Sequence, residues 1–322
     1  MDKRPLGTSG IRVAPLAFGG NVFGWTADET TSFALLDAFV DAGFDLVDTA
    51  DSYSRWVPGH VGGESETIIG RWFERSGKRG RVVLATKVGM EMASGDKGLA
   101  KERILRAAEA SLRRLRTDVI DLYQAHVDDT TVPLDESLAA FDALLKQGKV
   151  RAIGASNYTG PRLREALATS RALGFAAYAT LQPHYNLVER QPFERDLLPV
   201  CRESGIAVIP YFSLANGFLT GKYRSTSDLA KSVRGGGVKQ YLDARGLLIL
   251  DELDRVAARL HATPATIALA WLASRPTVVA PIASATSVAQ LTELLRVALT
   301  RLDAAAIEAL DAASSHGGSG IS

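Results

Sequence analysis

Four residues carry groups that together could protonate a carbonyl oxygen: Asp48, Tyr53, Lys87 and His126. Asp48 and Tyr53 share the stretch FDLVDTADSY, in which an apolar run ends on a carboxylate and a phenol follows five residues later. Lys87 and His126 end two later apolar runs, RVVLATK and VIDLYQAH. The spacings are equal, 87 − 48 = 39 and 126 − 87 = 39, and 322/8 is about 40. The three ionisable groups therefore occupy equivalent places in successive units of a repeat.

The chemistry that suits this set is protonation of a developing alkoxide. In water a phenol has a pKa of about 10 and a lysine ammonium one of about 10.4. An adjacent ammonium favours the phenolate, so we expect Lys87 to lower the Tyr53 pKa and Asp48 to keep Lys87 charged. Tyr53 would then act as a general acid near neutral pH, with His126 donating to the same oxygen. None of these groups supplies a hydride, so a carbonyl reduction also needs an organic cofactor.

Each of the four residues, taken alone, has an ordinary structural explanation. Asp48 could cap a turn, and Lys87 could extend its ammonium to the surface. His126 could be a hydrogen-bonded rim residue, and Tyr53 an amphipathic packing residue. The combination favours a site, because the structural explanation must place a carboxylate, an ammonium, a phenol and an imidazole at one rim by chance.

Short apolar, β-branched runs alternate with amphipathic stretches along the whole chain. Eight runs are predicted as strands: 16–19, 44–48, 81–87, 119–126, 150–156, 178–182, 206–211 and 277–282. Helices are predicted from Asp28 to a stop at Gly43, over 101–116 and 134–147, from Thr263-Pro264, and from Thr286 or Ser287. Unbroken alternation predicts parallel strands with crossover helices, and eight such units most economically close into an α/β fold, the (β/α)8 TIM barrel.

A barrel of this kind carries its chemistry at the C-terminal ends of its strands, because those ends meet at one mouth. Asp48, Lys87 and His126 would converge there, and the loop after Asp48 can bring Tyr53 over the same opening. The alternative fold, an open doubly wound sheet, would need a glycine-rich dinucleotide turn after the first strand. That place reads FGGNVFGW, without a GxGxxG pattern, so the sequence favours the barrel.

We expect one domain over 1–322, with two additions to the barrel. The start, RPLGTSGIRVAP, predicts a small β-hairpin that would plug the barrel bottom. The segment 216–247 follows the seventh strand, contains RGGG and has little periodicity, so we expect a long loop there. The sequence assigns no role to 224–247 within it. The tail from about 314 is rich in glycine and serine and is expected to fray.

The amino-acid composition limits the kinds of molecule that this protein is expected to bind. The chain has 37 basic and 36 acidic residues and no basic stripe interleaved with aromatics, which argues against nucleic acid. No apolar run approaches the ~20 residues that span a membrane, and the polar start lacks a secretory signal. The single cysteine, Cys201, forms no internal disulfide, which fits a reducing compartment such as the cytoplasm.

These residues resemble the aldo-keto reductase superfamily. The resemblance rests on the stretches DTADSY, ATKVG, LYQAH, IGASN, LQPHYNL, PYFSLANGFLTGKY and PIASATSVAQLTE, which follow one another from the second strand to the last helix of the repeat. It implies a (β/α)8 barrel that binds a nicotinamide dinucleotide in extended form, without a Rossmann domain. It also implies reversible reduction of an aldehyde or ketone.

The resemblance assigns a role to each residue of the set. Tyr53 would be the proton donor, Lys87 its pKa-lowering partner, Asp48 the counter-charge of the lysine, and His126 the donor that orients the substrate. We refer to these four as the tetrad.

The resemblance also implies cofactor contacts. These are Ser156, Asn157 and Gln182 at the nicotinamide carboxamide, Tyr211 stacked on the nicotinamide ring, Leu214 and Lys222 near the pyrophosphate, and Ser284, Thr286, Gln290 and Glu293 at the adenosine end. Structural alternatives stay open for several of them. Ser156 and Asn157 could cap the next helix, Gln182 could be plain loop chemistry, and Thr286 could cap a helix with or without a nucleotide.

The sequence departs from the family pattern at the adenosine end. Thr286 stands where many members carry a basic residue for the 2′-phosphate, and Leu294 stands where an asparagine is common. The expected cofactor is NADPH by family habit, with NADH admitted. Arg234 or Lys239, in the long loop, would then have to supply the missing cation.

The sequence says less about the substrate pocket than about the cofactor site. Phe23, Trp25 and Trp56 could wall an apolar pocket above the nicotinamide, which would suit a small aldehyde or ketone with apolar parts. Packing under a rim loop is the alternative for each of them.

The sequence leaves two alternatives to a reductase. A cofactor-binding, redox-sensing subunit resembling potassium-channel β subunits would keep the same tetrad. A barrel hydrolase using Asp48 and Asp51 lacks a metal cluster or a second carboxylate in register.

Overall fold

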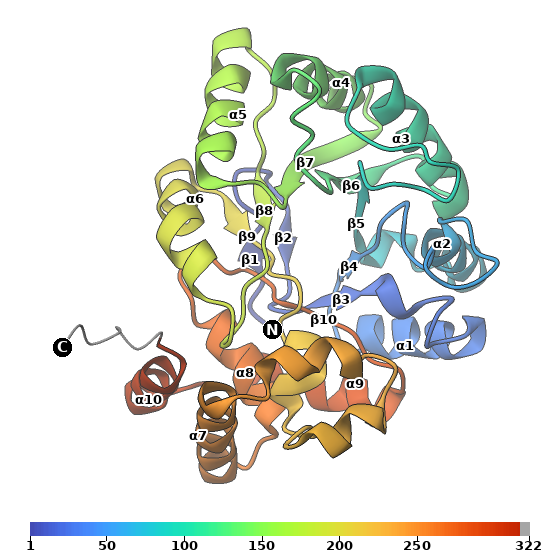
Figure 1. The fold of residues 1–322 in the computed structure, drawn as a ribbon. Helices are drawn as coiled ribbons and strands as arrows, with labels where there is room; N and C mark the ends of the chain where they lie inside the picture. The colour runs from blue at the N-terminus through green and yellow to red at the C-terminus, as the bar shows by residue number, and fades with distance from the viewer. Residues whose placement is uncertain (316–322) are drawn as a thin grey trace.

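The computed structural model describes residues 1–315, and its centre is an eight-stranded parallel sheet (Figure 1). The strands are β3 (Ala17–Gly19), β4 (Leu46–Asp48), β5 (Val83–Val88), β6 (Ile120–Ala125), β7 (Val150–Ser156), β8 (Thr180–Gln182), β9 (Ala207–Val208) and β10 (Ile282–Ala283). They pair in chain order, and β10 pairs with β3. All eight predicted runs therefore contain or overlap a strand, and the predicted barrel is confirmed.

The sheet closes between β9 and the segment that leads into β10. The backbone N–H of Val208 donates to the Thr277 carbonyl at 2.8 Å, and Val279 N–H donates back to the Val208 carbonyl at 3.0 Å. Ile282 N–H then donates to the Pro210 carbonyl at 2.9 Å. The last predicted run, 277–282, thus begins as this closing contact, and its regular strand starts only at Ile282.

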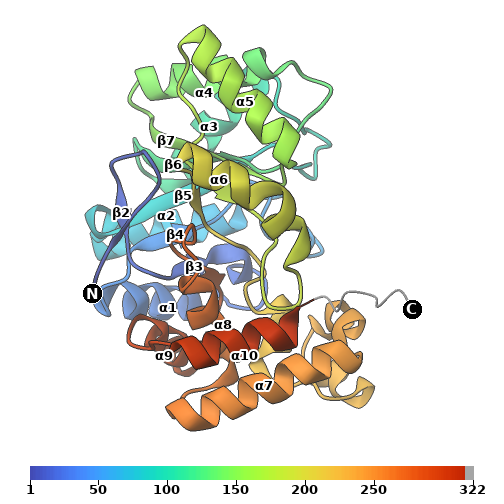
Figure 2. The same ribbon diagram turned by 90° about the vertical axis from the view of Figure 1, so that its left-hand side faces the viewer.

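Helices surround the sheet (Figures 1 and 2). They are α1 (Glu29–Asp41), α2 (Glu64–Ser76), α3 (Lys101–Leu115), α4 (Leu134–Lys146), α5 (Gly160–Leu173), α6 (Leu198–Ser204), α7 (Ala244–Leu260), α8 (Pro264–Ala273), α9 (Val288–Leu295) and α10 (Ala304–Ser314). Figure 2 shows α7 and α10 lying along one another outside α8. No helix between residues 1 and 315 combines the length and apolar character that crossing a bilayer requires.

Three of the predicted helix starts are confirmed by capping side chains. The Asp28 carboxylate accepts from Thr31 N–H at 2.8 Å at the start of α1, and Thr263 Oγ1 accepts from Thr266 N–H at 3.2 Å at the start of α8. Of the two candidates for α9, Ser287 is the cap, because its Oγ accepts from Gln290 N–H at 3.3 Å. These side chains satisfy backbone donors that would otherwise lack partners.

The N-terminal hairpin closes the bottom of the barrel, as predicted. Strands β1 (Arg4–Pro5) and β2 (Arg12–Val13) pair antiparallel. Leu6 and Val13 are fully buried and belong to the same apolar cluster as Leu122 inside the barrel. At the hairpin turn a side chain on Gly7 would come within 2.0 Å of the Ala179 carbonyl oxygen, so only glycine fits there.

The long segment after β9 is more ordered than expected. It contains the short 3₁₀ helices η4 (Ala215–Thr220), η5 (Thr226–Lys231) and η6 (Gly235–Tyr241), and it ends at Asp243, the cap of α7. Buried residues such as Val238, and the contact of Tyr241 with Phe218 at 5.7 Å between ring centroids, hold it on the barrel. The expectation for the tail falls mostly on 316–322, outside the described residues.

Candidate active site

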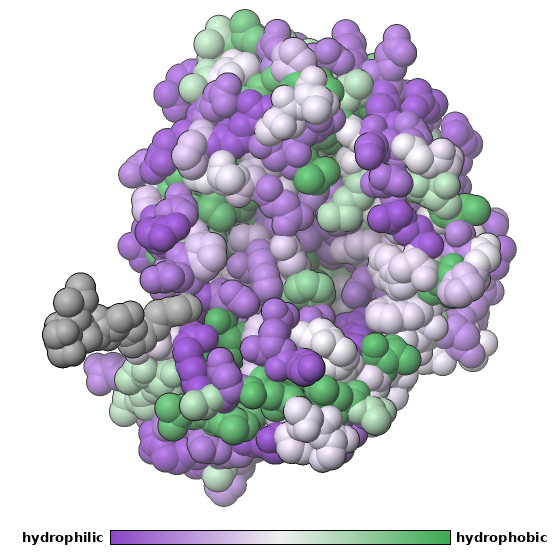
Figure 3. Space-filling model, viewed as in Figure 1, coloured by the Kyte–Doolittle hydropathy of each residue, from purple (hydrophilic) through white to green (hydrophobic). Residues whose placement is uncertain are grey.

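A cavity of about 980 Å³ lies at the C-terminal ends of the strands. Asp48, Tyr53 and His126 line it, and Lys87 lies fully buried beneath them. The volume is at the upper end of the range for small-molecule sites, roughly 300–1,000 Å³. In the space-filling view the corresponding face is hollowed near its centre (Figure 3).

The four tetrad residues come together as the 39-residue spacing predicts. Lys87 Nζ donates to Asp48 Oδ2 at 2.7 Å and to Tyr53 OH at 2.9 Å. The rings of Tyr53 and His126 lie 5.8 Å apart between centroids. Asp48 is the last residue of β4, Lys87 is next to last in β5, and His126 follows β6 directly. Neighbouring strand ends therefore supply the groups.

The Asp48–Lys87 ion pair is removed from solvent, with 2% and 0% of the side chains exposed. The remaining hydrogen-bonding capacity of both groups is used. Asp48 Oδ1 accepts from Gln182 Nε2 at 2.9 Å and lies 3.4 Å from Gln124 Nε2, while the third donor bond of Lys87 goes to the Thr49 carbonyl at 2.8 Å. Such satisfaction is what makes a buried ion pair tolerable.

The direction of the Tyr53 pKa is the opposite of the expected one. Burial raises the Tyr53 pKa well above 10.0, and the negative charge of Asp48 adds to the rise. Burial also lowers the Lys87 pKa, with Asp48 opposing that change. The expectation failed because burial of the phenol disfavours the charged phenolate, and the Asp48 carboxylate adds its own negative charge. Tyr53 is therefore protonated at neutral pH, which is the state a proton donor needs.

His126 is held as a neutral imidazole. Burial and the nearby Lys87 charge place its pKa well below 6.5. Its Nδ1 is buried without a partner among residues 1–315. A proton on that nitrogen would be an unsatisfied donor, so the tautomer with the proton on Nε2 is favoured. His126 can then donate a hydrogen bond without adding a charge to the cavity.

All ten residues expected at the cofactor line the same cavity: Ser156, Asn157, Gln182, Tyr211, Leu214, Lys222, Ser284, Thr286, Gln290 and Glu293. The three expected at the carboxamide are hydrogen-bonded to their surroundings. Ser156 Oγ donates to the Gln182 carbonyl at 2.8 Å, and Asn157 Nδ2 donates to the His126 carbonyl at 2.8 Å. Neither residue caps the next helix, because Thr159 caps α5.

Tyr211 has one covered ring face. Its ring stacks on His184 with 5.4 Å between centroids and 17° between planes, and its hydroxyl donates to Asn157 Oδ1 at 2.8 Å. Sequence reasoning did not identify His184, although this residue lies in the stretch LQPHYNL. The covered face leaves the opposite face of Tyr211 for another flat group.

The loop after Tyr211 has unusual backbone geometry. Phe212, Ala215 and Asn216 have φ values of 51°, 48° and 58°, and Gly217 follows with 93°. The backbone N–H groups of Ala215 and Gly217 donate within the loop, to the Phe212 and Leu214 carbonyls at 2.7 and 2.8 Å, so the loop is a tight turn beside the cavity. Lys222 lies beside this loop, where its ammonium is 5.0 Å from the centroid of the Tyr223 ring.

The two candidates for a loop cation differ. Arg234 lines the cavity, and its guanidinium stacks over the Trp25 ring at 5.1 Å from the centroid. With the Asn21 amide nitrogen donating to Ser284 Oγ, the amide oxygen accepts from Arg234 Nη2 at 3.2 Å. Lys239 is exposed and does not line the cavity. The suggestion of Lys239 is therefore wrong.

At the adenosine end Gln290 folds back onto the start of α9. Its Oε1 accepts from the Thr286 backbone N–H at 3.0 Å and from Thr286 Oγ1 at 3.1 Å. Glu293 lies 3.4 Å from Arg296. Thr286 therefore contributes polar groups and no charge at this end.

The three aromatic residues expected in the substrate pocket have different places. Phe23 is wrong as a pocket wall: it is fully buried and stacks on Phe18 at 5.3 Å between centroids. Trp56 lines the cavity with 46% of the residue exposed. Trp25 packs edge-on against Trp56 at 5.6 Å between centroids, and it supports the wall from behind.

A buried charged cluster lies next to the site. Asp51 Oδ2 accepts from Arg103 Nη2 at 3.1 Å, and Glu66 Oε2 accepts from Arg114 Nε at 2.7 Å. Asp51 and Asp48 have different partners and do not share a site, which removes the basis for a hydrolase built on the two. Burial raises the Asp51 pKa to about 7, the negative charge of Glu66 adds to the rise, and Arg103 opposes it.

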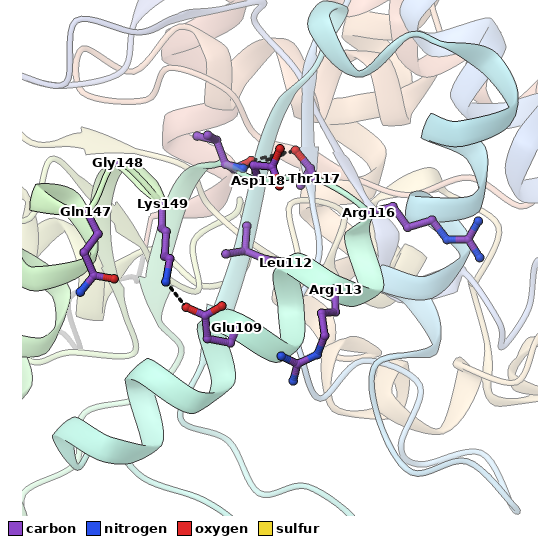
Figure 4. Close-up of a pocket in the computed structure, with 10 residues that line it drawn as sticks. Glu109, Leu112, Arg113, Arg116, Thr117, Asp118, Gln147, Gly148 and Lys149 are labelled. Atoms are coloured by element: carbon purple, nitrogen blue, oxygen red, sulfur yellow. Dashed lines mark hydrogen bonds and ion pairs between the residues drawn. The ribbon is translucent and has the colours of Figure 1, made fainter.

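A second hollow of about 600 Å³ lies at the other end of the barrel, between the C-terminal end of α3 and the residues that precede β7 (Figure 4). Lys149 is paired with Glu109 there, and Arg116 is paired with Glu74. None of the predicted site residues lies in it.

Comparison with known proteins points to one family. The model of the aldo/keto reductase family matches residues 15–315. The chain is 35% identical over 311 residues to the uncharacterized oxidoreductase YrpG of Bacillus subtilis, covering 94% of this chain and 93% of the relative. It is 35% identical over 279 residues to the aldo-keto reductase YhdN of the same organism, with 83% and 78% covered. It is also 31% identical over 306 residues to a probable voltage-gated potassium channel subunit beta of Oryza sativa, with 92% and 90% covered.

The raised pKa of Asp51 predicts how an Asp51→Asn substitution changes stability with pH. A carboxyl whose pKa is higher in the folded state than its ordinary 3.8 stabilises the fold most at low pH, and this contribution is lost as pH rises through about 7. Asparagine does not ionise. The melting temperature of Asp51→Asn minus that of the wild type should therefore be more positive at pH 8 than at pH 5, by at least about 2 °C.

Thermal unfolding followed at pH 5, 6, 7 and 8 measures this difference. Asp28→Asn is the control, because asparagine also caps a helix and the Asp28 pKa is lowered, so nothing titrates there in this range. A difference for Asp51→Asn that stays constant or shrinks with rising pH would show that Asp51 is ionised throughout.

Proposed function

The chain belongs to the aldo/keto reductase family, and from its site we propose that it reduces an aldehyde or ketone to the alcohol, reversibly, with a nicotinamide dinucleotide. One observation carries the proposal. The protonated phenol of Tyr53 lies 2.9 Å from Lys87 Nζ, and Lys87 lies 2.7 Å from the buried Asp48 carboxylate. This arrangement offers a proton to an oxygen at the cavity floor, and family membership makes the chain an oxidoreductase.

Each tetrad residue has a defined part in the proposed reaction. The substrate carbonyl oxygen would accept hydrogen bonds from Tyr53 OH and from His126 Nε2–H. As negative charge develops on that oxygen, Tyr53 gives it a proton. Lys87 stabilises the phenolate that remains, and Asp48 holds the ammonium in place. Because His126 is neutral, it orients the oxygen without competing as an acid.

The residues present fit a nicotinamide dinucleotide. Tyr211 has one ring face covered by His184 and the other available for a flat ring. The ammonium of Lys222, which lines the cavity beside the turn that ends at Gly217, suits a pyrophosphate. Ser156, Asn157 and Gln182 would hold the carboxamide. When bound, the reduced nicotinamide supplies the hydride that the tetrad lacks.

We propose NADPH as the preferred form, with NADH also accepted. Support comes from Arg234, which lines the cavity without a carboxylate partner among the described residues. Thr286 and Gln290 offer hydrogen bonds but no positive charge at the adenosine end. The preference therefore depends on Arg234, and we expect it to be modest.

A cofactor-binding regulatory subunit is the second candidate, because the chain is 31% identical to a probable potassium channel β subunit. The tetrad is compatible with both functions. The reductase is favoured because two similar bacterial proteins are named as an oxidoreductase and an aldo-keto reductase, and because the cavity is large enough for a substrate. A cytoplasmic location belongs to the same proposal and rests on the single cysteine, Cys201, which is buried.

Tyr53→Phe tests the role of Tyr53 as the proton donor. The substitution removes the transferred proton and keeps the ring, so kcat for aldehyde reduction should fall by a factor of about 10² to 10⁴. The Kd for NADPH, measured by protein fluorescence, should change less than about threefold, because Tyr53 is not a cofactor contact. Near wild-type kcat in Tyr53→Phe would show that another group protonates the product.

Binding of the two dinucleotides tests the proposed cofactor preference. Fluorescence titration of the wild type should give a lower Kd for NADPH than for NADH. Arg234→Gln should raise the Kd for NADPH roughly tenfold and that for NADH less, since a charged contact is lost only with the 2′-phosphate.

Lys239→Gln is the matched control, because it removes a charge from the same loop outside the cavity. Equal losses for both dinucleotides in Arg234→Gln would assign Arg234 to the shared pyrophosphate and contradict the proposed preference.

A further inference from the structure

Arg55 is a cation at the cavity mouth that has no carboxylate partner among the residues that the structure describes. It lines the cavity two residues after Tyr53, and its guanidinium makes neither a hydrogen bond nor an ion pair within residues 1–315. Most arginines on this chain pair with an acid, as Arg162 pairs with Asp128 at 3.0 Å. Within the described part of the chain, the Arg55 charge is therefore left without a partner.

The backbone around Arg55 is held firmly. Ser54 is fully buried with a left-handed φ of 71°, and its Oγ donates to the Phe23 carbonyl at 2.7 Å. Arg55 N–H donates to the Ser52 carbonyl at 3.2 Å. Trp56, the next residue, packs against Trp25. The turn thus presents Arg55 from a fixed base beside the exposed wall residue Trp56, while the guanidinium itself stays unpaired.

The other charged residues that line the cavity already have a partner or a proposed role. Lys222 and Arg234 come from the segment after β9, and the proposed dinucleotide accounts for them. The acids that line the cavity are Asp48, which is paired with Lys87, and Glu293, which lies beside Arg296. Arg55 is the lining cation that shares a loop with the proton donor, so its charge acts on the side where a substrate enters.

We propose that Arg55 binds an anionic group, a carboxylate or a phosphate, at the end of the substrate remote from its carbonyl. The proposal rests on the proposed reductase function and names its substrate class: carbonyl compounds that carry a negative charge. Two residues span at most roughly 7 Å of chain, so Tyr53 and Arg55 can contact two ends of one small molecule. Trp56 would pack against the carbon skeleton between them, and a guanidinium matches the planar acceptor pair of a carboxylate or phosphate.

The test compares each charged substrate with a neutral counterpart. Wild-type kcat/KM should be about fivefold higher for 4-carboxybenzaldehyde than for methyl 4-formylbenzoate, as one partly exposed charge pair permits. The value of kcat/KM should likewise be higher for glyceraldehyde 3-phosphate than for glyceraldehyde. Each pair gives a ratio of charged to neutral substrate, and the larger of the two ratios shows whether the site prefers a carboxylate or a phosphate. Both ratios should decrease when the ionic strength rises from about 0.01 M to 0.15 M, because the Debye screening length falls from about 30 Å to 8 Å.

Arg55→Gln should bring both ratios to about one. A ratio within one variant is insensitive to loss of active protein, so a damaged fold does not imitate this result. Arg171→Gln is the control, because Arg171 is exposed on α5 outside the cavity, and it should keep the wild-type ratios. Wild-type ratios near one, or ratios that Arg55→Gln leaves unchanged, would overturn the proposal. If Arg55→Gln raises the Kd for NADPH by the same factor as it lowers the substrate ratios, Arg55 binds the dinucleotide instead, and the proposal is also overturned.

A binding measurement separates this proposal from the proposed function. Calorimetry is done in the presence of NADPH, which cannot oxidise an alcohol. The wild type should bind 4-(hydroxymethyl)benzoate more tightly than the methyl ester of this compound. Arg55→Gln should bind the two compounds equally. If this holds but no aldehyde is reduced, the anion site stands and the reductase fails. If aldehydes are reduced but the two alcohols bind equally, the reductase stands and the anion site fails.

Discussion

The buried ion pair between Lys87 and Asp48 is the constraint on which the rest of the structure depends. Removing two charges from water costs several kcal/mol per ion, and the cost is recovered only when the pair is well placed and its remaining hydrogen bonds are made. Gln182 and Gln124 approach the carboxylate from two other strands, and the Thr49 carbonyl accepts from the ammonium. A closed barrel, sealed below by the N-terminal hairpin, is what brings groups from four strands to one point.

That pair also sets the protonation states above it. Because Asp48 balances Lys87, the phenol of Tyr53 has a carboxylate within reach as well as an ammonium, and burial then dominates its pKa. His126 is kept neutral by the same burial and by the lysine charge. The cavity floor therefore offers two neutral donors over a compensated ion pair. Such a floor can stabilise negative charge that appears only during reaction, since it carries no free charge to attract an anion beforehand.

The sequence predicted the parts that depend on spacing and on chain order. Equal intervals of 39 residues placed Asp48, Lys87 and His126 at neighbouring strand ends, and cap residues such as Asp28 marked helix starts. It could not predict what depends on three-dimensional neighbours. Phe23 and Trp56 are both aromatic residues in mouth loops, but only packing against Phe18 decides that Phe23 is core. Gln124 is two residues before His126 on the same strand face, so strand alternation could have indicated it. The direction of the Tyr53 pKa shift depends on how deeply the phenol is buried and, after that, on how close Asp48 lies, and only the structure shows both.

The central claim is that these four side chains direct a hydride from a nicotinamide onto a carbonyl carbon. Mass spectrometry of the alcohol formed from 4-nitrobenzaldehyde, with NADPH deuterated at both C4 positions, tests it most directly. We predict one deuterium on the alcohol carbon for each dinucleotide oxidised. An alcohol without deuterium, or no alcohol from enzyme that binds NADPH, would contradict it.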